Sequence, residues 1–542
     1  MNFSKIVQMP REAACQSADS GALVQNNFLP FVAPVLLLVA SLIGVFGKKK
    51  SATADLKAIE LLAGLTMVIA IISAFILVDS GPRTSALLGA NGIGFSTRLD
   101  VISATMLLLV SFIGWIVVRF SRIYLDGEDR QRSFMAWLSM TLAMVMLLII
   151  AGNLVQLAFA WIATSLGLHR LLLFYPDRIA ARRAARKKFV TARMADTALI
   201  TAVVSLAAAY GTSDIATITG AARAGHSDIL AVLAAASLAI AAMIKSAQFP
   251  LHGWLTEVME APTPVSALLH AGVINAGGFV LIRFADVMLL APGVLAALVM
   301  IGGFTAIFGG LVMLTQPAVK TSLAWSTVAQ MGFMMMQCGL ALFPLALLHI
   351  VAHSLYKAHS FLASGGAVER IAAARRPGAI AIPNARSVGK AFLAALAIYC
   401  AIGWGFGFHH KSPQSLALGA ILIFGVAYLL AQGLADAAPR ALTRRVAVYA
   451  VAASIGYFTL HGLAIWLTGD TLPATPAPGP LEWALIVLAV VSFGVVAIAQ
   501  AMFPLWAHHP AAAGLRVHLS NGLYANALFD RLLGGWALRR PS

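Results

Sequence analysis

The chain has 542 residues, of which 60% are hydrophobic and only 11% are charged, whereas about 25% of the residues in ordinary soluble domains are charged. Lys plus Arg is 38 and Asp plus Glu is 21, so the net charge is +17, yet so few charges could not cover a soluble nucleic-acid-binding surface. This composition excludes a soluble enzyme and a disordered chain. The three widely spaced cysteines predict neither a disulfide framework nor a zinc site.

Long apolar runs follow one another along the chain without strand-like alternation. Because about 20 apolar residues cross a bilayer as a helix, these runs predict helices and not a barrel. Residues 1–27 are expected to form an extracytoplasmic tail, and residues 506–542 a cytoplasmic one. We predict an all-α polytopic membrane protein of about fifteen spans, at 28–46, 58–78, 99–120, 134–151, 153–174, 193–210, 228–248, 263–284, 293–314, 320–340, 344–364, 388–408, 415–433, 446–467 and 482–505.

Basic residues are distributed unevenly between the predicted loops. Of the 38 Lys and Arg residues, 29 fall in the loops that follow odd-numbered spans and in the C-terminal tail, and 7 fall on the other side. Cytoplasmic loops carry an excess of basic residues. We therefore expect the N-terminus outside, the C-terminus in the cytoplasm and an odd number of spans.

The densest basic segment, residues 169–188, is predicted to be the loop after the fifth span. Two interpretations are open. It could be a topology anchor beside anionic lipid, or it could be a docking surface for an acidic cytoplasmic partner. The candidate docking residues are Arg178, Arg182, Arg183, Arg186, Lys187 and Lys188.

Ionisable residues inside predicted spans are the candidates for function, because burying a charge in lipid costs roughly 2.5–3.5 kcal/mol on insertion scales. Residues four apart on a helix lie on one face, and the last three of the set have this spacing. Imidazole and amine groups at that spacing could pass a proton through water. Simple packing is an alternative, and a metal site is disfavoured because no carboxylate or cysteine follows at ligand spacing. The set is Asp196, Lys245, His270, His349, His353 and Lys357.

Prolines follow the seventh span closely. Pro250, Pro262 and Pro264 predict helices broken beside Lys245, which is typical of an ion pathway in transporters. The alternative is an ordinary loop at 249–263, with Lys245 reaching the membrane interface and neutralised by glutamates of that loop.

Three ordered segments carry a resemblance to known proteins. They resemble the antiporter-type, proton-conducting subunits of respiratory complex I and of multisubunit cation/proton antiporters, and the subunit L type most closely. The resemblance implies helices 1–3 at 28–133, inverted five-helix repeats at 134–284 and 285–433, and helices 14–15 at 434–505. The segments are KSAQFPLHGWLTEVMEAPTPVSALLHAGVINAGG (245–278), KTSLAWSTVAQMGFMMMQCGL (320–340) and HIVAHSLYKAHSFLASGG (349–366).

The resemblance also implies roles for residues. Lys245 matches the central channel lysine, His270 the histidine of the eighth span, and Asp196 an acidic residue of the sixth. His349, His353 and Lys357 match the relay between two half-channels. Two departures stand out: Ile162 follows Trp161 where this family has a glutamate, and the twelfth span has no lysine beyond Lys390 at its entrance.

Two further segments, 166–189 and 518–535, resemble the DabB family, the membrane subunits of the DAB inorganic-carbon accumulation system. This implies a multi-pass protein of the bacterial inner membrane that lets protons or another cation flow to energise conversion of CO2 to bicarbonate. The partner DabA, on the cytoplasmic side, would hold the zinc in a site like that of β-carbonic anhydrases. This chain would have no cofactor and would not itself be an enzyme.

Two other functions remain open, a proton-pumping subunit of an NADH:quinone oxidoreductase and a subunit of a Na⁺/H⁺ antiporter complex. A path of lysines and histidines favours H⁺, because Na⁺ prefers oxygen ligands.

Overall fold

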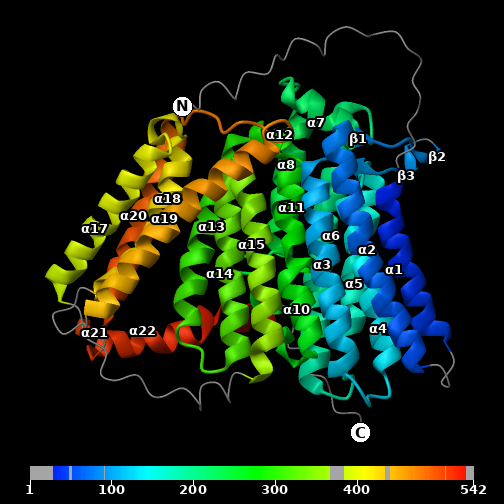
Figure 1. Ribbon diagram of the computed structural model, residues 1–542, viewed down its shortest axis with the longest axis horizontal. Coiled ribbons are helices and arrows are strands. Elements are labelled where there is room, and N and C mark those ends of the chain that lie inside the picture. The colour runs from blue at the N-terminus through cyan, green and yellow to red at the C-terminus, as the bar shows by residue number, and fades with distance from the viewer. Residues whose placement is uncertain are drawn as a thin grey trace.

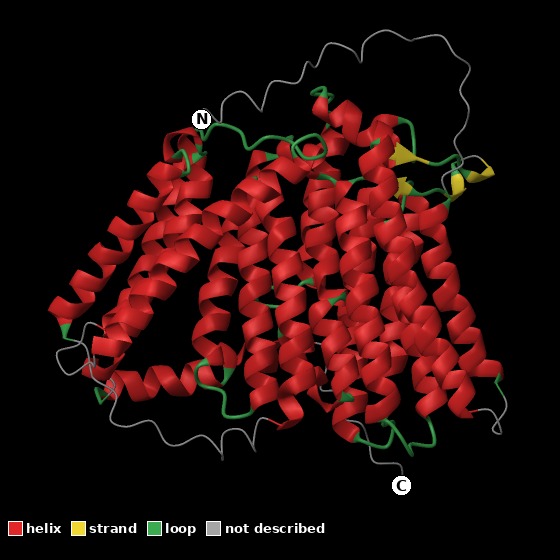
Figure 2. Ribbon diagram, viewed as in Figure 1, coloured by secondary structure: helices red, strands yellow, loops and turns green. Residues whose placement is uncertain are grey.

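Long helices standing side by side dominate the computed structural model, which describes residues 28–47, 52–90, 92–366, 384–433, 440–506 and 508–532 (Figures 1 and 2). The predicted all-α membrane fold is confirmed. Each predicted span coincides with helical structure, and eleven helices of the described residues are long and apolar enough to cross a membrane. The tail predicted at 1–27 and the end of the C-terminal tail, 533–542, lie outside the described residues.

The first half of the chain contains the helices that carry most of the candidate site. They are α1 (Leu29–Phe46), α2 (Ala52–Ser80), α3 (Val101–Tyr124), α4 (Gln131–Ile149), α5 (Leu154–Leu172), α6 (Ile179–Tyr210), α7 (Ile215–Arg223), α8 (Ile229–Lys245), α9 (Gly253–Glu257), η4 (Val258–Glu260), α10 (Thr263–Ala271), η5 (Val273–Asn275), α11 (Ala276–Arg283) and α12 (Ala285–Leu289).

The second half continues the row of helices. Its elements are α13 (Pro292–Met313), α14 (Val319–Gly339), α15 (Phe343–Leu362), η6 (Ala363–Gly366), α17 (Ala385–Gly405), η7 (Phe408–His410), α18 (Pro413–Gly433), α19 (Arg440–Thr468), α20 (Pro480–Ala501), α21 (Phe503–Trp506), α22 (Pro510–Ser520), η8 (Gly522–Tyr524) and α23 (Ala525–Leu532).

Two short, two-stranded antiparallel sheets lie together with α7 at one end of the helices (Figure 1). Near them, Asp100 starts α3 by accepting a hydrogen bond from the backbone N–H of Ser103, while the Ser103 hydroxyl accepts one from the backbone of Asp100. This reciprocal capping satisfies donors that a helix start leaves unpaired. The paired strands are β1 (Arg83–Thr84) with β4 (Arg98–Leu99) and β2 (Leu88–Ala90) with β3 (Ile93–Phe95).

Glycines let α13 and α14 approach closely. A Cβ placed on Gly302 would lie 2.6 Å from the backbone nitrogen of Met336, and one on Gly332 would lie 2.5 Å from that of Ala306. Small residues allow this contact between membrane helices, where packing and not water expulsion holds helices together. The pair fixes α14, which carries partners of the candidate site.

The main core joins α1 to α15, and a separate cluster holds α17, α18 and α19 together. Figure 1 shows α17–α20 as a group beside the main row, and α22 running across the helix ends opposite α7.

Candidate functional site

The buried Lys245 is the last residue of α8. Its Nζ lies 4.4 Å from the ring centroid of Trp161 on α5, a cation–π contact. The ammonium makes no ion pair with a carboxylate of any described residue. The missing glutamate at Ile162 is therefore not replaced by another direct carboxylate partner, and an aromatic face lies beneath the charge instead.

Trp161 connects this lysine to Asp196 on α6. The indole Nε1 donates to Asp196 Oδ1 at 2.9 Å, and Arg193 Nη2 lies 2.6 Å from Asp196 Oδ2. Asp196 is thus paired with its own helix neighbour and held by the indole. Asp196 makes no direct ion pair with Lys245, and Trp161 contacts both side chains.

The glutamates near the broken segment do not neutralise Lys245. Glu257 pairs with Lys187 at 2.9 Å, and Glu260 lies 3.6 Å from Arg178. The alternative of a lysine neutralised by Glu257 and Glu260 is therefore wrong: Lys245 stays buried.

The eighth span is interrupted in its middle. α10 ends at Ala271, Gly272 adopts non-helical backbone angles, and the helix resumes as η5 and α11. The Asn275 side chain donates to Ala271 O at 3.0 Å and to Ser354 Oγ at 2.8 Å, which bridges the break to α15. Interrupted helices inside membranes occur where freed backbone groups meet protein or water. Two small cavities, each about 20 Å³, border Lys245, and both also border Val273 at this break.

His349, His353 and Lys357 lie along one face of α15, as their spacing predicts. The rings of His349 and His353 are 6.0 Å apart between centroids. Lys357 is completely buried, and its Nζ donates to Leu323 O at 3.1 Å and to Ser326 Oγ at 2.8 Å. His359 on the same helix is exposed and belongs to another face.

The buried His270 on α10 is brought against this stripe. Its ring stacks on Phe361 at 4.3 Å, its Nδ1 lies 3.0 Å from Thr327 Oγ1, and its backbone carbonyl accepts from His353 Nε2 at 3.1 Å. His349 Nδ1 meets Gln337 Oε1 at 2.9 Å. Each of the three imidazoles has one buried ring nitrogen without a hydrogen-bond partner among the described residues, so each leaves one donor or acceptor position unpaired.

The basic segment 169–188 is not the predicted loop. α6 begins at Ile179, fourteen positions before the predicted span start at 193, because its alanines pack inward while arginines extend outward. Arg178, Arg183 and Arg186 are exposed and Arg182 is half-buried. Lys187 and Lys188 are only 1% and 5% exposed, so these two cannot form an exposed docking surface.

Lys187 holds the C-terminal helix α23 against the bundle. Its Nζ lies 2.7 Å from Asp530 Oδ1 and 2.9 Å from Glu257 Oε1, and it also donates to Asn526. Arg183 lies 2.7 Å from the other Asp530 oxygen. Sequence reasoning missed this cluster because its members lie far apart in the chain.

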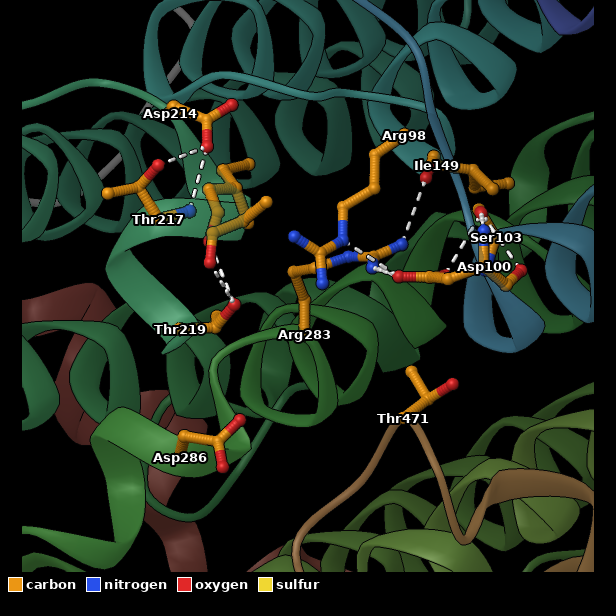
Figure 3. Close-up of polar contacts among 12 residues, drawn as sticks. Arg98, Asp100, Ser103, Ile149, Asp214, Thr217, Thr219, Arg283, Asp286 and Thr471 are labelled. Carbon is orange, nitrogen blue, oxygen red and sulfur yellow. Dashed lines mark hydrogen bonds and ion pairs between the residues drawn. The ribbon is translucent and has the colours of Figure 1, made fainter. Parts of the chain in front are cut away.

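A second unpredicted cluster lies at the opposite end of the bundle. Figure 3 shows the guanidinium groups of Arg98 and Arg283 converging on Asp100. Nearby, Arg223 pairs with both carboxylate oxygens of Asp286, at 2.9 and 3.1 Å, and donates to Thr471 O at 2.7 Å. These contacts join the ends of α3, α7, α11 and α12 to the segment before α20. Among the residues that the structure describes, no group of three or more His, Cys, Asp or Glu could hold a metal ion.

Comparisons with known proteins identify the relatives of this chain. Residues 151–379 match the family described as NADH:quinone oxidoreductase/Mrp antiporter, TM, and residues 88–135 match the N-terminus of complex I chain 5. The chain is 39% identical to a probable inorganic carbon transporter subunit DabB2 of Halothiobacillus neapolitanus over 82% of this chain and 81% of that one. It is 49% identical to the probable DabB of Hydrogenovibrio crunogenus over 49% and 52%.

A more distant relative and a solved structure share the architecture. Subunit L of the NADH-quinone oxidoreductase of Mycobacterium tuberculosis is 31% identical over 74% of this chain and 63% of its own length. The Mrp complex from Dietzia sp. superposes with a TM-score of 0.57 at 22% identity, covering 94% of this chain and 57% of that one, and so supports the fold. The chain therefore belongs to the DabB family of inorganic carbon transporter subunits, within the antiporter-like membrane subunits of complex I and Mrp complexes.

Proposed function

We propose that this chain is the proton-conducting membrane subunit of an inorganic-carbon uptake complex in the bacterial inner membrane. Protons run down their gradient through it and energise conversion of CO2 to bicarbonate by a DabA-like partner on the cytoplasmic side. The catalytic zinc belongs to that partner, whose site resembles that of β-carbonic anhydrases. This chain is an ion-translocating subunit and not an enzyme.

The observation that carries the proposal is the buried, carboxylate-poor row of lysines and histidines. Lys245, His270, His353 and Lys357 are each at most 6% exposed, and they line the break in the eighth span and the face of α15 that packs on it. Ionisable groups are tolerated inside a membrane chiefly where they serve transport. Amines and imidazoles with open positions exchange protons with water, and they offer no oxygen cage for Na⁺.

Protons enter from outside, pass the Lys245/His270 region and the stripe of α15, and leave near the basic face. That orientation places the N-terminus outside and the C-terminus in the cytoplasm, and the excess of basic residues in loops after odd-numbered spans supports it.

The experiment combines co-purification with proton flux. The full chain is purified from its own host, its bound proteins are identified, and the complex is placed in liposomes that enclose a pH-sensitive dye. We expect a large zinc protein to co-purify, and inward proton flux to respond to an imposed potential. Co-purified redox subunits would instead assign the chain to an NADH:quinone oxidoreductase, and small antiporter subunits to a Na⁺/H⁺ antiporter. Absence of proton flux above empty liposomes would refute proton conduction.

A further inference from the structure

Lys188 is a buried lysine to which the proposed proton path assigns no role. It is 5% exposed, and its Nζ donates to Ser165 O at 2.7 Å and to Ser165 Oγ at 2.9 Å, both on α5. These two bonds use two of the three donors of an ammonium group. Lys188 makes no ion pair with a carboxylate in the described ranges. A buried charge without such a partner is costly, which makes this lysine a candidate for a function.

Lys188 and Lys245 border the same cavity. This cavity, about 20 Å³, is one of the two that border Lys245, and Thr191 and Trp254 also line it. A cavity of about 10–15 Å³ or more can hold one water molecule when polar groups surround it. Most of the lining is apolar, so the two lysines supply the polar groups that a single bridging water would contact. Like charges that border one cavity disfavour the state in which both amines are protonated.

The position of Lys188 along α6 shows which end of the bundle it lies toward. Lys188 lies nine residues after the start of the helix at Ile179 and eight residues before Asp196. At 1.5 Å per residue it stands roughly 13 Å inside the helix start, between the basic end of the bundle and the level of Asp196. Its neighbour Lys187 points to the cluster of Glu257 and Asp530 at that same end.

We propose that Lys188 is a proton carrier that connects Lys245 with the basic end of α5 and α6. The inference rests on the proposed function and adds a site to it. The transfer needs no covalent chemistry beyond proton exchange. A protonated Lys245 breaks one N–H bond and gives the proton to the bridging water, which gives one of its own protons to the neutral amine of Lys188. Lys188 then breaks one N–H bond and gives the proton to a water molecule on the side of the basic end. Its amine is neutral again, and one charge has moved.

The test measures proton flux in liposomes containing the full-length chain with its co-purifying partner. The variants are Lys188→Gln, Lys188→Arg and Lys245→Gln, with Lys57→Gln on the exposed face of α2 as the matched control. Because positioned proton carriers contribute roughly 10²–10⁴-fold, we expect Lys188→Gln to lower flux at least about tenfold, toward the level of Lys245→Gln. Lys57→Gln should keep the wild-type flux.

Lys188→Arg separates a carrier from a structural cation. Arginine keeps the positive charge and the donors to Ser165 but does not release its proton. We expect this variant to keep the melting temperature of the complex and to lose flux. Wild-type flux in either Lys188 variant, with Lys245→Gln inactive, would overturn the role of Lys188 and leave the proposed function standing. Absence of flux in the wild type would overturn both. If Lys188→Gln does not fold, the arginine variant alone decides.

Discussion

The indole nitrogen of Trp161 donates a hydrogen bond to Asp196, while the Lys245 ammonium lies over the same ring. One side chain of α5 thus stands between the anion of α6 and the cation of α8. The resemblance to antiporter-type subunits implies a glutamate after this tryptophan, where this chain has Ile162. The indole therefore supplies the only described contact that links the two charges, and it makes Trp161 a positioning residue.

Trp161→Phe keeps the ring beneath Lys245 but removes the donor to Asp196. Leaving a buried acceptor without its partner costs about 1–3 kcal/mol, so we expect a lower melting temperature together with a several-fold loss of proton flux. Both are measured on the purified complex. Trp466→Phe is the control, because Trp466 is 79% exposed on α19. Unchanged flux in Trp161→Phe would show that the ring alone suffices.

Helix α15 contains a buried histidine, His353, and an exposed one, His359, which serve as test and control. His353→Ala removes an imidazole that is 5% exposed and contacts the carbonyl of His270, so we expect loss of carbon accumulation by cells with normal assembly of the complex. His359→Ala alters an exposed histidine six residues further on the same helix and should have no effect. Radiolabelled bicarbonate uptake, with membrane-extracted complex as the assembly measure, checks both. Equal uptake by His353→Ala and the wild type would contradict the path.

Much of this architecture could be predicted from the sequence, because lipid imposes strong rules. Apolar runs gave the helices, and the spacing of His349, His353 and Lys357 placed them on one face before their partners were known. The segment 169–188 could not be placed in this way. A hydropathy profile places a segment with so many cations outside the membrane. The amphipathic start of α6 instead buries Lys187 and Lys188 and exposes Arg183 and Arg186.

Contacts between distant segments explain the other differences. Lys187 is buried because Glu257 and Asp530, from two other parts of the chain, surround it. The predicted sixth span starts at residue 193, which places Lys188 outside the helix. A helix that starts at Ile179 places Lys188 about two turns before Asp196. A search limited to apolar runs misses a lysine that reaches the core from a basic helix start.

The remaining arginines of the basic segment keep the docking hypothesis open. Arg178 and Arg186 are exposed at the end of the bundle that we propose is cytoplasmic. Arg178→Glu combined with Arg186→Glu should weaken co-purification of the partner several-fold if that face binds an acidic surface. Arg119→Glu, at a 61% exposed side chain on α3, is the control. Unchanged co-purification would leave this segment as a topology anchor.

We expect the ion cluster around Asp100, at the opposite end of the bundle, to make the stability of the protein sensitive to acid. Burial by itself raises the pKa of its carboxyl, but the charges of Arg283 and Arg98 outweigh it and hold the pKa below its usual value. A lowered folded-state pKa means that the stabilisation is present above the unfolded value of about 3.9 and is lost as pH falls below it. We expect the melting temperature to drop on acidification below about pH 4, and to drop less in Asp100→Asn. Equal slopes for the two proteins would contradict this assignment.

Lys187→Met tests what holds α23 in place. Removing one partner of a buried ion pair costs about 3–5 kcal/mol, because Glu257 would lose its cation and Asp530 would keep only Arg183. We expect a clearly lower melting temperature and faster proteolysis of the C-terminal segment. Arg178→Met is the control: its pair with Glu260 is about half exposed on both sides and should contribute only about 0–1 kcal/mol. If Lys187→Met behaves like this control, α23 is held by its apolar contacts and not by the ion cluster.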